Sequence, residues 1–183
     1  PGHVDPHTAR WHDAYRDFGI KPRIARPSSD ALIRRAASDK GLPSINVLVD
    51  LYNAISILHA VPIGGEDLDH YDGPARLVIA TGGEPFHTSS DGQPAIDHPE
   101  PGEPIWTDGA GVTCRRWNWR QTNRTAIGHH TTRVGFIIDS CREREGIWLV
   151  PTGPLTNIAL ALRAAPDLAS RIAGISVMGG GTF

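Results

Sequence analysis

Residues 42–73 read LPSINVLVDLYNAISILHAVPIGGEDLDHYDG, and within this stretch the sequence changes from a helical pattern to a strand pattern. Residues 44–58 are apolar on nearly every side, and their polar residues Asn46, Asp50 and Asn53 recur at i, i+4 and i+7. This spacing predicts a helix with a single polar stripe. A buried helix must satisfy such groups internally or with a ligand, so the stripe either braces a neighbouring loop or forms a pocket wall.

Two further helices are predicted before this stretch. Residues 5–19 carry apolar side chains at i, i+3, i+4 and i+7, counted from Trp11, which is the spacing of an amphipathic helix. Residues 28–41 predict a second helix with Ser28 or Ser29 as its N-cap. The helical elements therefore gather in the first third of the chain.

Short β-type runs separated by Gly, Pro and Asp clusters follow, between residues 75 and 140. Within them, residues 87–102 are rich in Pro, Gly, Ser and Asp and predict a long surface loop. Residues 147–183 have a different pattern, a strand–helix–strand unit of the α/β type. A charged segment at residues 140–146 is the expected boundary, which gives domains 1–145 and 146–183.

The apolar runs are too short to span a bilayer, and no membrane partner is expected. The first residues do not resemble a signal peptide. Cys114 and Cys141 lie in strand-like segments and are interpreted as buried thiols of a reducing compartment. Together these features predict a cytoplasmic protein.

The formal net charge of -2 hides a strong segregation of charge along the chain. Residues 66–108 hold ten carboxylates and one arginine, whereas residues 109–138 hold five arginines and no carboxylate. Residues 21–40 are also basic, with six Lys or Arg against two Asp. Because local patches govern nucleic-acid binding more than total charge does, the net charge does not exclude it.

Residues 114–125, CRRWNWRQTNRT, combine planar cations with aromatic side chains. Guanidinium groups match phosphate oxygens, and indole rings can stack on an unpaired base. The candidate RNA-binding residues are Arg115, Arg116, Trp117, Trp119, Arg120 and Arg124. An alternative stays open at this point: the tryptophans belong to the core and the arginines pack over them through cation–π contacts.

Four segments (residues 42–73, 77–86, 101–127 and 129–139) read collinearly like the B3/B4 domain of the phenylalanyl-tRNA synthetase β subunit, in its stand-alone form. The resemblance covers residues 4–140. It implies an α+β fold of helices and mostly antiparallel strands, in two packed subdomains whose interface forms an editing pocket. It also implies binding of tRNA or aminoacyl-tRNA, with no cofactor.

The resemblance supports the polar stripe of residues 46–53 as pocket wall. It places Thr125 at the family's hydroxyl position, and Thr131 is a further pocket candidate. Where the synthetase carries a histidine, this chain has Gly64, and the glycine pair of the synthetase is replaced by residues 114–125. In both departures the chain resembles the stand-alone members.

Hydrolysis of a mischarged tRNA needs an oriented water and donors for the developing oxyanion. Glu66 or Asp67 could orient the water, and Arg116, Arg120 or Asn118 could supply the donors. Alternatively, residues 64–67 form a tight turn whose acids cap the next element.

Residues 146–181 resemble a different family, the inosine/uridine-preferring nucleoside hydrolases, on the motif TGPLTNIALALR and the following MGG. That resemblance implies a calcium site to which Thr152 gives its backbone carbonyl, with nucleoside as the substrate. Asp67, Asp69 and Asp72 have only a superficially similar spacing to the remaining ligands. The alternatives to an RNA-binding deacylase are therefore a piece or fusion of a calcium-dependent hydrolase, or an inactive relic.

Overall fold

The computed structural model describes residues 5–141, 147–149 and 172–175, with side chains for residues 5–141. Contacts divide the chain into two units, Pro1–Cys141 and Arg142–Phe183. In the second unit, β9 (Ile147–Leu149) and β10 (Ile172–Ile175) pair in parallel. The helix that the sequence predicts between them lies outside the described residues.

The first helix, α1 (Pro6–Asp17), is bounded by signals that its sequence carries. The carboxylate of Asp5 accepts a hydrogen bond of 2.8 Å from the backbone N–H of His7, and Pro6 occupies the first helical position. The helix ends at Asp17, and Gly19, two residues later, has a φ of +73° that glycine readily adopts. Trp11 and Tyr15 are its buried aromatic residues, as the periodicity predicts.

The second helix, α2 (Ser28–Ala36), begins differently from the prediction. Its N-cap is Pro27, which offers no side-chain hydrogen bond, so neither predicted serine is the cap. The backbone N–H of Ser28 instead donates to Oδ1 of Asn118, at 3.3 Å. A residue 90 positions away along the chain therefore helps to satisfy the start of this helix.

The third helix, α3 (Val47–His59), uses two residues of the predicted polar stripe at its N-terminus. Asn46 is the N-cap and accepts from the backbone N–H of Val49 at 2.9 Å. The carboxylate of Asp50 accepts from the backbone N–H of Ile45 at 2.9 Å and from the Ser44 hydroxyl at 2.7 Å. The helix is also less buried than predicted, because an apolar stripe on it remains exposed within the first unit: Val47 87%, Leu51 56%, Ile55 42% and Leu58 77%.

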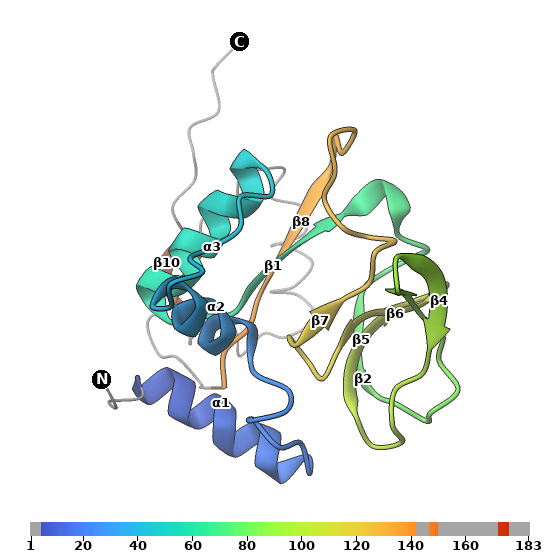
Figure 1. Ribbon diagram of the computed structural model, residues 1–183, viewed down its shortest axis with the longest axis horizontal. Coiled ribbons are helices and arrows are strands. Elements are labelled where there is room, and N and C mark those ends of the chain that lie inside the picture. The colour runs from blue at the N-terminus through green and yellow to red at the C-terminus, as the bar shows by residue number, and fades with distance from the viewer. Residues whose placement is uncertain (1–4, 142–146, 150–171, 176–183) are drawn as a thin grey trace. The chain divides into compact units, whose positions relative to one another are not determined.

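The strands form antiparallel sheets in the first unit, which establishes the α+β class (Figure 1). β1 (Ile63–Asp67) pairs with β8 (Val134–Ile138). A four-stranded sheet has the order β2 (Arg76–Ile79), β5 (Pro104–Asp108), β6 (Gly111–Arg115), β7 (Arg120–Gln121). In Figure 1 the three helices lie to the left of the β1–β8 pair and the four-stranded sheet lies to its right.

The prediction of a long loop at residues 87–102 is wrong for residues 87–97. β3 (Phe86–Ser90) and β4 (Gln93–Asp97) form an antiparallel hairpin there. Its turn is Asp91–Gly92, with φ of 51° and 77°, which is the type of dipeptide that tight hairpins prefer. A single 3-10 turn, η1 (Leu68–His70), follows β1.

Two apolar clusters hold the first unit together. Ala80, Phe86, Ile105 and Val112 pack between the hairpin and the four-stranded sheet. On the helical side, the ring of Trp117 meets Trp11 edge-on at 5.1 Å between centroids and Phe18 at 6.1 Å. Residues 114–125 are called the Trp/Arg segment below, and Trp117 from this segment therefore anchors α1 to the sheet. In the part of the chain that the structure describes, no helix is long and apolar enough to cross a membrane.

Candidate functional site

A cavity of about 290 Å³ opens between the helices and the β6–β7 hairpin, with β1 and β8 at its base. Aromatic and aliphatic residues make up about half of its wall, and most of the others are polar or charged. This volume is near the lower end of the range for small-molecule sites, roughly 300–1,000 Å³. The residues that line it are Ser28, Ala31, Leu32, Tyr52, Asn53, Ile63, Gly64, Glu66, Trp106, Cys114, Trp117, Asn118, Trp119, Arg120, Gln121, Ile137 and Asp139.

Glu66 brings a buried carboxyl group to this cavity. Glu66 is only 3% exposed, and the Thr125 hydroxyl donates a hydrogen bond to the Oε2 atom of this carboxyl group. No arginine, lysine or histidine of the described residues bonds to it. Burial therefore dominates and raises the pKa of Glu66 to about 7.

Asp139, which follows β8, is a second buried carboxyl group on the wall. Its oxygens accept from Nε1 of Trp117 at 3.3 Å and from Nδ2 of Asn118 at 3.4 Å. Burial raises its pKa to about 6 in spite of these two donors. Sequence reasoning missed this residue, although an aspartate directly after the apolar run VGFII is a signal that could have found it.

Arg120 supplies the cationic group of the cavity. It is exposed, its Nη2 atom donates to the Thr88 hydroxyl at 2.9 Å, and its guanidinium lies 6.0 Å from the ring centroid of Phe86. No carboxylate of the described residues pairs with it. Arg120 is thus a wall residue whose charge no described carboxylate neutralises.

The structure corrects the prediction for Arg115. Its guanidinium donates to both oxygens of Glu103, at 2.9 Å and 2.8 Å, and to Asp97 at 2.6 Å. Only 7% of the Arg115 side chain is exposed, and 3% of that of Glu103. This arginine is therefore an internal ion-pair residue and does not contact phosphate.

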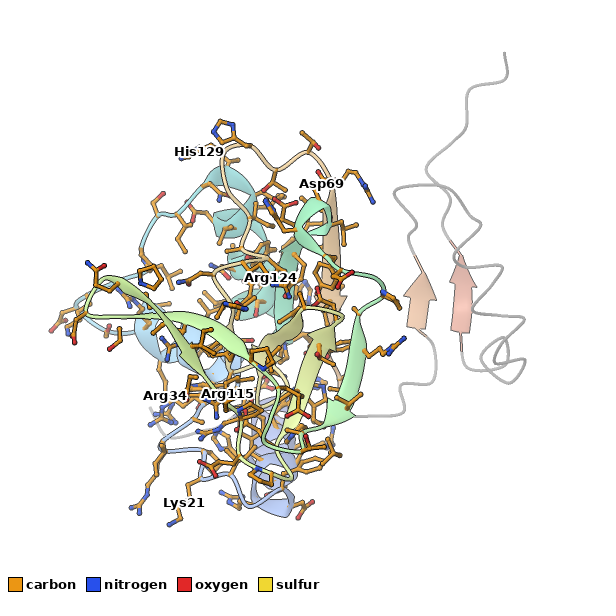
Figure 2. The ribbon with its side chains drawn as sticks, turned by 90° about the vertical axis from the view of Figure 1, so that its right-hand side faces the viewer. Lys21, Arg34, Asp69, Arg115, Arg124 and His129 are labelled. Carbon is orange, nitrogen blue, oxygen red and sulfur yellow. The ribbon has the colours of Figure 1, made fainter. Side chains whose placement is uncertain are left out.

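Arg116 and Arg124 also lie outside the cavity. Arg124 donates to both carboxylate oxygens of Asp108, at 2.9 Å and 2.7 Å, and to the backbone carbonyl of His70 at 2.6 Å. Arg116 lies over the ring of Trp119, 4.4 Å from its centroid, and bonds to Glu103 at 3.4 Å. Figure 2 shows Arg115 and Arg124 among the packed side chains of the sheet.

The Trp/Arg segment therefore follows the alternative left open by the sequence, in which tryptophans pack and arginines cover them. The rings of Trp117 and Trp119 reach the cavity from one side only, because α1 packs on Trp117 and Arg116 covers Trp119. Arg116 and Trp117 have φ of 48° and 68°, a left-handed conformation that is unfavourable for such bulky residues.

Asn118 is a brace rather than an oxyanion donor. Its Oδ1 atom faces the Tyr15 hydroxyl at 3.0 Å and the backbone N–H of Ser28 at 3.3 Å, while its Nδ2 atom donates to Asp139. The side chain is buried and joins α1, α2 and the end of β8. The catalytic role predicted for it is not favoured by this arrangement.

Asp67 lies away from the cavity, and its contacts match the alternative in which an acid caps the next element. Its carboxylate accepts from the backbone N–H of Asp69 at 3.0 Å, at the start of η1. Thr131 donates to the other oxygen at 2.6 Å, so Thr131 belongs to this turn and not to the pocket.

Of the polar stripe on α3, only Asn53 lines the cavity, because Asn46 and Asp50 cap the start of the helix. Gln121 is a further residue that the sequence reasoning missed. Its Nε2 atom donates to the backbone carbonyls of Gly65 at 2.9 Å and Thr125 at 3.3 Å, which fixes β1 beside β7.

No group of three or more His, Cys, Asp or Glu side chains that could hold a metal ion occurs in the described part of the chain. Thr152, the predicted calcium ligand, lies outside the described residues.

Comparison with known families decides the relationship of the first unit. The model of the B3/4 domain matches residues 10–145. The chain belongs to this family. The resemblance of the first unit to the β subunit of phenylalanyl-tRNA synthetase is thereby confirmed.

Curated relatives are similar to this chain over a much shorter stretch. The pyrimidine-specific ribonucleoside hydrolase RihB of Escherichia coli O1:K1 / APEC is 44% identical over 57 residues, which is 31% of this chain and 18% of that protein. The inosine-uridine preferring nucleoside hydrolase of Leishmania major is 41% identical over 54 residues, 30% of this chain and 17% of that protein. The chain thus spans less than a fifth of the length of either relative.

Proposed function

We propose that the chain binds the aminoacylated end of tRNA in the cavity of the first unit and hydrolyses the ester of a mischarged tRNA. Membership of the B3/4 family supports tRNA as the partner and the cytoplasm as the location. The observation that carries the proposal is the presence of Glu66 and Arg120 on the wall of one cavity.

Glu66 has the properties of a general base. A carboxyl group with a pKa of about 7 is poised to exchange a proton at neutral pH. In the proposed reaction its carboxylate takes a proton from a water molecule, whose oxygen forms a bond to the ester carbonyl carbon. The bond from that carbon to the ribose oxygen then breaks, and Glu66 returns the proton to the ribose oxygen.

Arg120 has the properties of an oxyanion donor. Attack by water places a negative charge on the carbonyl oxygen, and a guanidinium N–H can donate to it. Because Arg120 pairs with no carboxylate of the described residues, its charge is not already neutralised. Its bond to Thr88 fixes the orientation of the side chain.

Cys114 also lies on the cavity wall, but it is not suited to act as a nucleophile. Burial raises the pKa of its thiol far above the ordinary value. A protonated thiol is a poor nucleophile, because the thiolate is the reactive form. Hydrolysis by water, assisted by Glu66, fits the wall better than a covalent intermediate on sulfur.

The test is a time course of ester loss from a small panel of mischarged tRNAs. We expect Glu66→Gln to lower the rate by about 10²–10⁴-fold and Arg120→Ala by about 10²–10³-fold. Glu84→Gln and Arg76→Ala, which change the same residue types outside the cavity, should leave it unchanged. Binding of tRNA with no wild-type turnover would leave a recognition module and overturn the hydrolysis.

A second candidate function is calcium-dependent hydrolysis of nucleosides. It is favoured by the similarity to ribonucleoside hydrolases, which extends over 57 residues of this chain. A ligand that binds only the native protein raises its melting temperature. Stabilisation by calcium, together with release of base from a nucleoside, would support this function, and the absence of both would reject it.

A further inference from the structure

The opposite charges of the strand-rich half neutralise each other within the molecule. Arg115 pairs with Glu103 and Asp97, and Arg124 pairs with Asp108. Arg133 and Asp69 form a further pair, which is more exposed. The basic segment at residues 109–138 therefore contributes little net positive surface.

The connection between α1 and α2 is different, because its cations surround an open hollow. The hollow has a volume of about 520 Å³. Five of its lining residues are basic or can become so, and none of the lining residues is acidic. These five are His12, Arg16, Lys21, Arg23 and Arg26.

Two carboxylates, those of Asp13 and Asp30, offset part of this charge, and Arg16 pairs with Asp13 at 2.6 Å. Asp30 is shared by His12 at 3.0 Å, Arg26 at 3.3 Å and Arg34 at 2.7 Å, so one buried acid faces three basic groups. Lys21 and Arg23 are exposed and form no ion pair with any described residue. Figure 2 shows Lys21 and Arg34 at the margin of the unit, directed outward.

The loop that carries Lys21 and Arg23 is held in place by its backbone. The N–H of Ile20 donates to the carbonyl of Tyr15 at 2.8 Å, and the carbonyl of Lys21 accepts from Ile24 at 2.8 Å and from Ala25 at 3.1 Å. Ala25 is fully buried. The cations thus project from an ordered turn, so that binding there requires little ordering of the backbone.

We infer that this hollow is a binding site for the phosphate backbone of a nucleic acid, with Lys21 and Arg23 as its main contacts. Several cations around an open hollow, without lining carboxylates, suit a chain of phosphates that carries one charge per nucleotide. The inference rests on the proposed function only in taking tRNA as the nucleic acid. It assigns the phosphate contacts to the α1–α2 connection instead of the Trp/Arg segment.

The test measures binding of uncharged tRNA as a function of salt concentration, which needs no catalysis. The slope of log K against log salt is negative, and each lost phosphate contact reduces its magnitude by about 0.9. Lys21→Ala/Arg23→Ala should therefore reduce this magnitude by about 1.8. The Kd at 0.1 M salt should rise by roughly tenfold or more. Lys21→Arg/Arg23→Lys keeps the charge and should bind almost as well as wild type.

The matched control is Arg76→Ala/Arg133→Ala, which removes the same charge from the strand-rich half. If Lys21→Ala/Arg23→Ala and the control lose affinity for tRNA equally, or if Lys21→Ala/Arg23→Ala loses none, the hollow is not the site, and the proposed function still stands. If Lys21→Ala/Arg23→Ala loses affinity for tRNA but Glu66→Gln leaves deacylation unchanged, the hollow is supported and the proposed function fails. Wild-type protein that binds vesicles of anionic lipid but no tRNA would overturn both.

Discussion

Two regions of the same unit are rich in basic residues, but only in one of them do carboxylates neutralise the charges. Between residues 115 and 133, the guanidinium groups of Arg115, Arg124 and Arg133 pair with carboxylates from residues 66–108. Around residues 21–26, Lys21 and Arg23 project into solvent without such a carboxylate among the described residues. Density of arginine along the chain is therefore a poor guide to the charge that a surface presents.

The cause of the difference is strand pairing. Antiparallel pairing of β5 with β6 and of β1 with β8 brings an acidic stretch of chain beside a basic one. The connection between two helices belongs to no sheet, and Lys21 shares a neighbouring hollow with Glu100 and Glu103 without forming an ion pair with either. Glu66 and Asp67 differ from the paired acids of this stretch, since both are buried without an arginine partner among the described residues.

The largest effect is expected from Arg115→Ala. Removal of the guanidinium leaves Glu103 buried and without its main counter-charge, which should lower the free energy of unfolding by about 3–5 kcal/mol. Urea unfolding measures this value, with Arg23→Ala as the control. A similar loss from Arg23→Ala would break the distinction between the two regions.

Glu66→Gln should change how stability depends on pH. The folded pKa of about 7 lies above the ordinary value of 4.5, so between these values the folded state binds more protons and stability falls as pH rises. The fall should be about 3 kcal/mol and should be absent in the variant, although Asp139 contributes in the same direction. Unfolding free energies at pH 5 and pH 8 test this.

Glu84→Gln is the control of opposite sign. The backbone N–H groups of Thr81 and Gly82 lower the pKa of Glu84 to about 2, so its contribution is present above pH 4.5 and is lost as pH falls toward 2. The variant should lose stability at neutral pH rather than gain it. If Glu66→Gln and Glu84→Gln change the free energy of unfolding at neutral pH in the same direction, burial is not the cause of the Glu66 effect.

Tyr15→Phe should have an intermediate effect. Its hydroxyl lies 2.7 Å from the carbonyl of Arg116 and 3.0 Å from Oδ1 of Asn118, and it is the donor in this buried contact. Its loss should cost about 1–2 kcal/mol of unfolding free energy. Thermal unfolding measures the change, and an unchanged melting temperature would show that α1 does not depend on this bond.

The smallest effect on stability is expected from Lys21→Ala/Arg23→Ala. Both side chains are exposed and form no ion pair with the described residues, so the free energy of unfolding should stay within about 0.5 kcal/mol of wild type. Urea unfolding checks this before any binding measurement. A larger loss would mean that these cations stabilise the fold.

Local sequence signals predicted part of this molecule well. The spacing of Trp11 and Tyr15 and the stop at Gly19 gave α1, since these depend on neighbours within two turns. The Asp91–Gly92 turn was also a local signal, but the Pro- and Ser-rich composition around it favoured a loop. The hairpin was not predicted because the composition of the surrounding residues masks this turn signal.

The site was only partly predictable because strand register and packing determine it. Glu66, Arg120 and Asn53 were expected and share the cavity, whereas Asp139, which follows β8, and Tyr52, the neighbour of Asn53 on α3, were missed. The partner of Arg115 is twelve residues away in sequence and is selected by the pairing of β5 with β6. No local pattern of charge contains that information.

The left-handed turn at Arg116 and Trp117 has a consequence for the order of folding. Such a turn is unfavourable in isolation by roughly 1–2 kcal/mol per residue, so the β6–β7 hairpin cannot drive its own closure. Its supporting contacts come from afar: Trp117 donates to the carbonyl of Pro104 at 2.7 Å, and Tyr15 is 101 residues away from Arg116. We expect the hairpin to close late, after α1 has docked, so that substitutions in this turn speed unfolding and leave the folding rate nearly unchanged.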